Sequence, residues 1–142
     1  MILSLLKPPK RKRSRQPSKA NLEKQCLALW SLCVRTRDRK CQISGSDYQL
    51  QAHHIRSRSH KATYLDLENG MAVASRVHIL QKFNPEKFQD MVLEAIGDKE
   101  YQRLKAKSQA EFKPTVPWLM IMRDHLKQTL KHLEDEYGKL RG

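Results

Sequence analysis

The 142-residue sequence has few aromatic residues, no CxxC pair and no long apolar run. Aromatic side chains make up only 6% of the residues, which argues against a base-stacking surface for single-stranded nucleic acid. The odd number of cysteines, three, fits a reducing compartment better than a disulfide framework. No stretch approaches the roughly 18 apolar residues that a membrane-spanning helix needs. The opening MILSLL is too short for a signal peptide, and its charges follow rather than precede it. We therefore expect a cytoplasmic protein of one domain with no membrane partner.

Positive charge is the strongest compositional signal in the chain. The 28 Lys and Arg residues outnumber the 15 Asp and Glu residues, which gives a formal net charge of +13 and a pI near 9.9. A polyanion is therefore the expected partner. Nucleic acid comes first, and an anionic membrane surface is the weaker alternative.

Residues 1–20 are predicted to form a basic tail that precedes a single domain at 21–142. The run KPPKRKRSRQPSK contains seven Lys or Arg, three Pro and no acidic residue, so it cannot bury a core and is expected to be disordered when free. The tail is either a solvated appendage or an arm that lies on phosphates. We favour the arm, because the remaining chain is also basic. Its expected phosphate contacts are Lys10, Arg11, Lys12, Arg13 and Arg15.

Apolar periodicity predicts a mostly helical α+β domain. From Asn21, a good N-cap residue, to Arg39, apolar residues recur at helical spacing and mark one buried face that includes Cys26 and Cys33. A core role for these two cysteines is favoured over metal ligation. The other expected elements are a strand over 48–55, a long loop over 56–68, a strand over 70–74, a helix over about 76–83 capped by Ser75, and helices that begin after the N-cap Asn84, at about 99 and at 118.

Three histidines and one asparagine stand out around the two expected strands. His53 and His54 lie at the end of the first strand, Asn69 follows His54 by fifteen residues, and His78 follows nine residues later in the first turn of a helix. Two imidazoles can bind one metal ion while a third takes a proton from water. Each residue also has a simpler interpretation: the histidine pair as surface or core residues, Asn69–Gly70 as a turn, and His78 as a packing residue. The four together at this spacing favour a metal-assisted hydrolytic site.

The HHI sequence, Asn69 and His78 resemble the HNH motif of nucleases with the ββα-metal fold. The resemblance implies a ββα core at about 41–83, flanked by the N-terminal helix and by a helical extension over 84–142. It implies that His53 and His78 bind one divalent metal ion and that His54 is the general base. It also implies that Asn69 ties the loop between the strands and orients the base. The implied activity is that of a metal-dependent endonuclease, which hydrolyses DNA phosphodiester bonds.

A wider and looser resemblance covers roughly residues 21–140. The basic helix before the motif and the segments NPEKF and IGDKEYQRLKAKS after it are similar to the NinG (Rap) recombination proteins of lambdoid phages. This resemblance implies branched or recombination-intermediate DNA as the substrate and a bacterial or phage-infected cell as the setting. A toxin role stays open as well, because HNH domains also serve as toxins.

The expected cofactor is one divalent metal ion. Two imidazole ligands favour Mn, Ni, Co or Zn over Mg on ligand softness, whereas a substrate phosphate would supply the hard oxygens that Mg²⁺ prefers. Asp66 and Glu68 are candidates for an additional oxygen ligand, with solvated loop acids as the simpler interpretation.

A structural zinc ion is not expected. Many HNH proteins hold one with two CxxC pairs, and three of those four ligands are absent from this chain. The four corresponding positions are Cys41, Ser44, Ala74 and Val77. We expect Ala74 and Val77 to form an apolar plug instead.

Basic residues on both sides of the motif are the expected contacts for a DNA backbone. They are Arg37, Arg39 and Lys40 at the end of the first helix, and Arg56, Arg58 and Lys61 in the loop after His54. A solvated loop is the alternative for the last three.

Two other functions remain open from the sequence. One is a nucleic-acid-binding protein that keeps the HNH fold without catalysis, which metal-dependent cleavage by the purified protein would exclude. The other is a structural zinc module built on Cys41, His53 or His54, and His78, although its spacing matches no common zinc finger.

Overall fold

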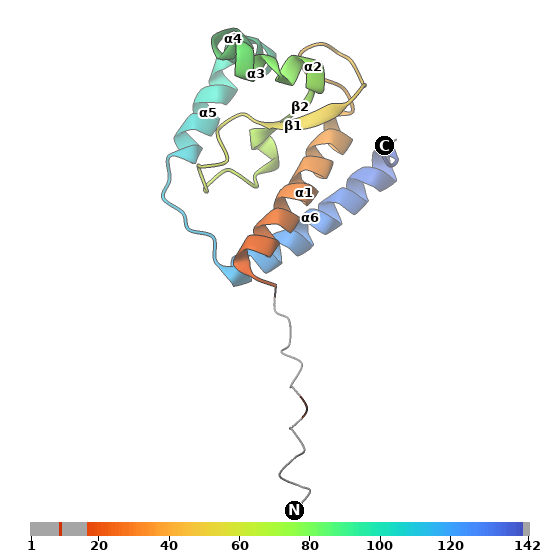
Figure 1. Ribbon diagram of the computed structural model, residues 1–142, viewed down its shortest axis with the longest axis vertical. Coiled ribbons are helices and arrows are strands. Elements are labelled where there is room, and N and C mark those ends of the chain that lie inside the picture. The colour runs from red at the N-terminus through yellow and green to blue at the C-terminus, as the bar shows by residue number, and fades with distance from the viewer. Residues whose placement is uncertain (1–8, 10–16, 141–142) are drawn as a thin grey trace, which may run out of the picture.

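A computed structural model describes residue 9 and residues 17–140 of the chain. The elements are α1 (Lys19–Asp38), β1 (Leu50–His54), the 3-10 helix η2 (Leu67–Asn69), β2 (Gly70–Ala74), α2 (Ser75–His78), α3 (Leu80–Phe83), α4 (Pro85–Ile96), α5 (Asp98–Ser108) and α6 (Val116–Tyr137) (Figure 1). The described part is α+β and mostly helical, as predicted. None of its helices is both long and apolar enough to cross a membrane. The expected arm at Lys10–Arg15 lies outside the described residues.

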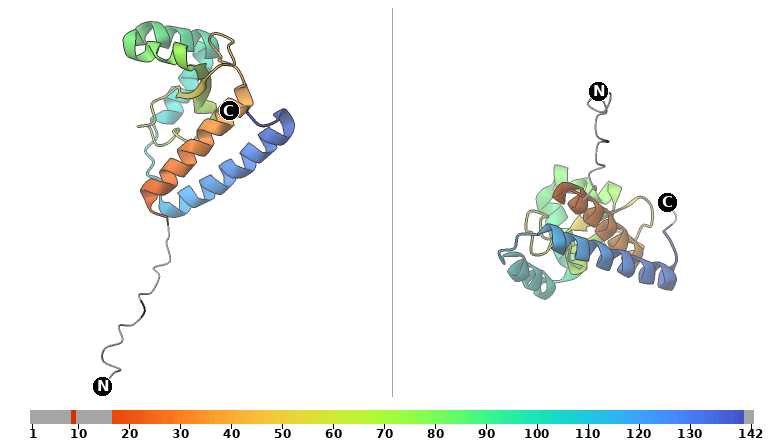
Figure 2. Two further views of the ribbon diagram at one scale, coloured as in Figure 1. Left: turned by 45° about the vertical axis from the view of Figure 1, so that its right-hand side comes forward. Right: turned by 90° about the horizontal axis from the view of Figure 1, so that it is seen from below.

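Helices α1 and α6 lie side by side and form the larger core of the domain (Figures 1 and 2). The predicted apolar face of α1 is confirmed, since Trp30 and Val34 on it are at most 1% exposed. Cys26 and Cys33 are buried on the same face, and their thiols donate to backbone carbonyls of α6 at 3.5 Å. Their predicted core role is therefore confirmed.

Helix α1 begins earlier than the sequence predicted. Ser18, not Asn21, is the N-cap residue, because its hydroxyl oxygen accepts the Asn21 N–H at 3.2 Å. Asn21 therefore lies in the first helical turn. The helix ends at Asp38, because Arg39 adopts a left-handed conformation with φ 62°.

Strands β1 and β2 form an antiparallel ribbon that lies between the α1–α6 pair and helices α2–α4 (Figure 1). The register pairs His53 with Met71 and His54 with Gly70. Strand β2 has its predicted bounds, whereas β1 is shorter than the predicted 48–55. The positive φ of Gln49, 50°, interrupts the extended chain just before β1.

The order strand, loop, strand, helix is confirmed, but the helix that carries His78 differs from its prediction. It is divided into α2 and α3, and Ser75 does not cap it. The Ser75 hydroxyl donates instead to the Gln49 side-chain oxygen at 3.0 Å, and Ala74 is the N-cap residue. Asn84 caps α4 as predicted, because its side-chain oxygen accepts the Lys87 N–H at 3.3 Å.

The last two helices differ from their predicted bounds at one end each, by two or three residues, and α6 ends at Tyr137 as predicted. Helix α5 ends at Ser108 and not near Glu111. Helix α6 begins at Val116, before the predicted Trp118, because the Thr115 hydroxyl accepts the Trp118 N–H at 3.2 Å and so caps the helix within the expected linker.

Candidate functional site

The imidazole rings of His53 and His78 lie next to each other on the face of the ribbon that Phe88 of α4 covers. His53 is the penultimate residue of β1 and only 5% exposed, and His78 is the last residue of α2. His53 Nδ1 and His78 Nε2 lie 3.2 Å apart. The ring of Phe88, from α4, packs edge-on against His53 with ring centroids 4.9 Å apart. Strand, helix and core thus bring together the two histidines that the sequence assigned to metal binding.

The hydrogen bonds of His78 define which of its nitrogens carries the lone pair. His78 Nδ1 lies 2.7 Å from the side-chain oxygen of Gln51. An amide oxygen only accepts, so Nδ1 carries the hydrogen and the Nε2 lone pair is directed at His53. Burial lowers the pKa of His78. Burial, and then the charges of His78 and His54, lower the pKa of His53 to about 4. Both rings are therefore neutral at neutral pH, which is the form that binds metal ions.

The separation of the two nitrogens fits one shared metal ion. Two ligands about 2.1 Å from one ion lie about 3.0 Å apart in octahedral and about 3.4 Å apart in tetrahedral geometry. The 3.2 Å between His53 Nδ1 and His78 Nε2 falls between these values. Within residues 17–140, no three His, Cys, Asp or Glu side chains gather into a metal-holding group. The donor set thus fits an ion held by two protein nitrogens, with its other positions open to oxygen ligands.

His54 lies on the opposite side of β1 and is held differently. Its Nε2 lies 2.9 Å from the backbone oxygen of Tyr64. A carbonyl oxygen only accepts, so Nε2 carries the hydrogen and Nδ1 carries the lone pair. Nδ1 makes no hydrogen bond to a described residue and is not among the buried unpaired side-chain atoms, so solvent reaches it. Burial lowers the pKa of His54, which keeps the ring neutral and able to accept a proton.

Asn69 ties the loop to the sheet, as the sequence predicted. The side chain is fully buried; its oxygen accepts the Arg56 N–H at 2.7 Å, and its amide nitrogen donates to the Arg56 carbonyl at 3.0 Å. The Ile55 N–H also donates to the Asn69 carbonyl at 2.9 Å. Asn69 makes no hydrogen bond to the His54 ring. Any orientation of the base by Asn69 therefore passes through the backbone that follows His54.

Two of the predicted DNA-contact residues hold elements of the fold together. Arg37 donates to the carbonyls of Leu67 and Gly70, at 2.8 Å each, and so joins α1 to the start of β2. Arg56 donates to the Ser108 hydroxyl at 3.1 Å and to the Tyr101 hydroxyl at 3.0 Å, which joins the loop to α5. Arg37, which also pairs with Asp38, therefore uses most of its guanidinium donors inside the domain, and Arg56 uses two of them.

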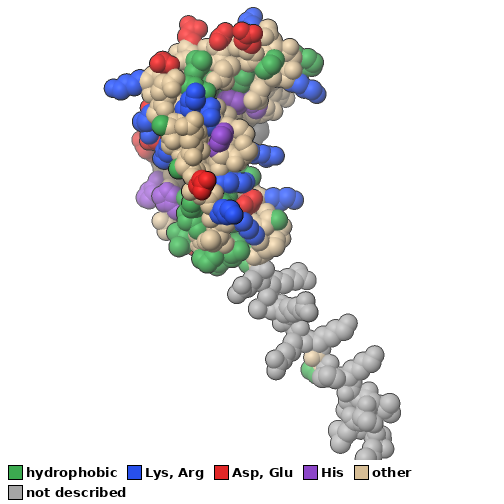
Figure 3. Space-filling view, turned by 90° about the vertical axis from the view of Figure 1, so that its left-hand side faces the viewer, with side chains coloured by type: hydrophobic (Ala, Val, Ile, Leu, Met, Phe, Trp, Pro, Cys, Tyr) green, Lys and Arg blue, Asp and Glu red, His purple; other side chains and the backbone are tan. Residues whose placement is uncertain are grey.

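The four other predicted contacts differ in how free their side chains are to bind DNA phosphates. The side chains of Lys40 and Arg58 are exposed and pair with no described residue. Lys61 lies 4.0 Å from a Glu23 carboxylate oxygen and 4.3 Å from the centre of the Tyr64 ring. Arg39 donates to the Gly138 carbonyl. Figure 3 shows a face on which Lys and Arg side chains lie among histidines, with acidic side chains gathered mainly at the upper edge.

The predicted apolar plug at the zinc-ligand positions is confirmed. Cys41, Ala74 and Val77 belong to one core cluster, in which they pack with Phe88. The Cys41 sulfur accepts the Ser44 N–H at 3.2 Å, so all four positions lie close together without forming a closed ligand set.

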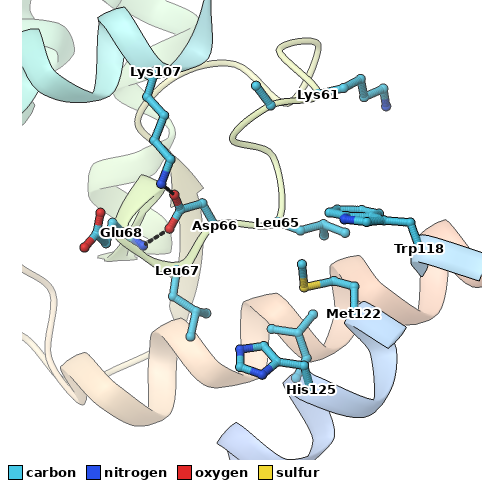
Figure 4. Close-up of a pocket in the computed structure, with 11 residues that line it drawn as sticks. Lys61, Leu65, Asp66, Leu67, Glu68, Lys107, Trp118, Met122 and His125 are labelled. Atoms are coloured by element: carbon cyan, nitrogen blue, oxygen red, sulfur yellow. Dashed lines mark hydrogen bonds and ion pairs between the residues drawn. The ribbon is translucent and has the colours of Figure 1, made fainter. Parts of the chain in front are cut away.

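Asp66 and Glu68, the candidate oxygen ligands, interact with α5. Asp66 pairs with Lys107 and Glu68 pairs with Arg103. Asp66 also lines a cavity of about 460 Å³ between the loop, α5 and α6, and none of the four motif residues lines this cavity (Figure 4).

Four residues of the site were not assigned a functional role from the sequence. Gln51 fixes the tautomer of His78, and its position two residues before His53 on the strand could have suggested this. Phe88 and Trp30, which pack against His53 and His54, were predicted only as core residues. The Tyr64 carbonyl is a backbone group and leaves no signal in the sequence.

Comparison with known proteins gives no relative. No protein-family model, no curated protein and no solved structure matches the chain.

Proposed function

We propose that the protein is a metal-dependent endonuclease of the HNH type, with a ββα-metal core, that hydrolyses DNA phosphodiester bonds. One observation carries this proposal. Two neutral imidazole nitrogens converge at a separation suited to one metal ion, and His54, the next residue along β1, keeps a free lone pair on Nδ1. The net charge of +13 supports a polyanionic substrate.

The residues of the chain would divide the reaction between them. His54 Nδ1 takes a proton from a water molecule as its oxygen forms a bond to phosphorus, and the imidazolium that results stays hydrogen-bonded to the Tyr64 carbonyl through Nε2. The bond from phosphorus to the leaving oxygen breaks, and that oxygen is protonated from solvent. A divalent ion bound by His53 and His78 would supply electrostatic stabilisation of the charge that develops on the phosphate and the leaving oxygen. Arg58 and Lys40 are exposed cations suited to hold the flanking phosphates.

The resemblance to the NinG proteins makes branched DNA the proposed substrate within this class. A panel of linear, nicked, flapped and four-way DNA, each incubated with Mg²⁺ or Mn²⁺ and with chelator, tests both the metal-dependent cleavage and the preference for branched DNA. Cleavage of any substrate that requires the metal ion supports the endonuclease. DNA binding without cleavage across the whole panel would favour the non-catalytic alternative.

The His78→Ala variant is expected to bind Mn²⁺ at least about 10- to 100-fold more weakly than the unmodified protein, because it loses one of two nitrogen ligands and even loss of a group that supports a ligand costs that much. Its cleavage rate should recover partly at high metal concentration, since His54 is intact. Calorimetric titration and rate measurements at several Mn²⁺ concentrations check this. His132→Ala, which removes an exposed histidine of α6 away from the site, is the matched control. Equal metal affinity in both variants would remove His78 from the ligand set.

Deletion of residues 1–16 is expected to weaken DNA binding without changing the fold, because Ser18 and the start of α1 are retained. The deleted segment holds six of the 28 Lys and Arg residues and no acid. For every phosphate that the tail neutralises, the deletion should lower the slope of log affinity against log salt by about 0.9 on duplex DNA. Binding curves at several salt concentrations on two unrelated duplexes measure this. Deletion of residues 1–6, which removes no charged side chain, is the control. An unchanged slope after the longer deletion would show that the tail does not bind phosphates.

A further inference from the structure

Trp30 makes two specific contacts beside the base, in addition to filling the core. Its indole ring stacks on the imidazole of His54, with ring centroids 3.8 Å apart and an interplanar angle of 11°. Its Nε1–H donates to the Asp66 carbonyl at 2.9 Å, while His54 Nε2 donates to the Tyr64 carbonyl at 2.9 Å. The two stacked rings therefore bind the same short loop segment at carbonyls two residues apart. A loop movement that removed one acceptor would also disturb the other.

Gly70 leaves the space that this arrangement needs. It pairs with His54 in the register of the ribbon. A Cβ atom at Gly70 would lie 2.7 Å from Cζ2 of Trp30 and 2.4 Å from Cγ2 of Val34. The backbone there has φ −116°, which any residue adopts. The absence of a side chain is thus required by the position of α1 and of the indole, and not by the backbone conformation.

We propose that Trp30 is a positioning residue for His54. The lack of a side chain at Gly70 leaves the space that the Trp30 indole occupies. The indole face restricts the orientation of the imidazole plane. In that plane Nε2–H points at the Tyr64 carbonyl and the Nδ1 lone pair points away from it. Rotation of the ring would break the Tyr64 hydrogen bond and move the lone pair. The catalytic consequence rests on the proposed function, whereas the orientation and tautomer of the ring are properties of the protein alone.

Two readouts test this proposal separately. The first is the tautomer of His54 in the metal-free protein, measured from the nitrogen shifts of the ¹⁵N-labelled ring, with the signals assigned by their loss in His54→Ala. The second is the single-turnover cleavage rate, measured beside the DNA affinity. The variants are Trp30→Leu, which removes the aromatic face, Trp30→Phe, which keeps one, and Gly70→Ala, which displaces the indole and Val34 without changing either side chain. Thermal melting confirms that each variant is folded.

In the unmodified protein, His54 should be almost entirely in the Nε2–H form. Trp30→Leu and Gly70→Ala should give a mixture of tautomers and a cleavage rate lower by about 10- to 100-fold, with DNA affinity unchanged. Trp30→Phe should keep both the Nε2–H tautomer of His54 and the cleavage rate close to those of the unmodified protein. In the His54→Ala background, Trp30→Leu should cause no further loss of rate, because Trp30 acts through His54.

Three outcomes decide between the claims. A single Nε2–H tautomer with an unchanged rate in Gly70→Ala and in Trp30→Leu would overturn the positioning role. If Trp30→Leu does not fold, Gly70→Ala and Trp30→Phe decide alone, and equal tautomer mixtures in both would also overturn it. A tautomer shift as expected, with no cleavage by the unmodified protein on any DNA, would uphold the role of Trp30 and refute the proposed function.

Discussion

The His54→Ala variant is expected to cleave DNA about 10²- to 10⁴-fold more slowly than the unmodified protein, which is the usual effect of losing a general base. His54 carries the solvent-accessible lone pair that accepts the proton of water. The metal ligands His53 and His78 are unchanged, so metal affinity should be retained. Single-turnover rates on a labelled duplex with saturating Mn²⁺ measure the effect, and calorimetry measures the metal affinity.

The control for this substitution is His132→Ala. His132 is an exposed residue of α6 and is expected to contribute nothing to the reaction. Removal of the His54 ring uncovers part of the Trp30 face, so melting temperatures of both variants should be compared with that of the unmodified protein. A folded His54→Ala variant that cleaves at the unmodified rate would exclude His54 as the base.

The Asn69→Ala variant is expected to lower the free energy of unfolding by about 2–6 kcal/mol, because it leaves two backbone groups of Arg56 without partners at about 1–3 kcal/mol each. Such a loss is a large part of the roughly 5–15 kcal/mol that stabilises a typical domain. The fully buried amide at Asn69 bonds both the N–H and the carbonyl of Arg56, two residues after His54. The cleavage rate should therefore fall as well, through displacement of the loop that carries the Tyr64 acceptor.

Urea unfolding at a temperature where Asn69→Ala is folded measures this change. Asn21→Ala is the control, because the Asn21 side chain is exposed and the bond from its backbone N–H to Ser18 survives the substitution. A loss below about 0.5 kcal/mol, the usual range for surface substitutions, would show that Asn69 does not hold the loop.

The elements that could be predicted were those with strong local signals. The run Gly70–Ala74 is wholly buried, begins at the glycine of an Asn-Gly pair and ends before a helix, and its bounds were predicted correctly. The spacing of His53, Asn69 and His78 predicted a cluster, and the structure places the two predicted ligands 3.2 Å apart. The strand depends on a short-range pattern, whereas the approach of the two histidines also depends on the pairing of β1 with β2 and on the position of α2.

The errors arose where two residues could satisfy the same local rule. Ser18 and Asn21 are both good N-cap residues, and only the hydrogen bond between them shows which one caps α1. Ser75 was predicted to cap a helix, but it is the first residue of α2 and its hydroxyl donates to the Gln49 side chain beside the start of β1. The contacts of His54 could not be predicted at all. Trp30 reaches it from helix α1, and the acceptor on Tyr64 is a backbone atom, so neither contact has a sequence signature.

The central claim is that the three histidines form one metal-dependent hydrolytic site. The most direct test is the single-turnover cleavage rate of a DNA substrate from the panel, measured with the full-length protein as Mn²⁺ is raised from zero in the presence and absence of chelator. The rate should be absent without metal, rise with Mn²⁺ and saturate as a single class of site fills. A folded protein that binds the DNA and accumulates no cleaved product at any Mn²⁺ concentration would contradict the claim.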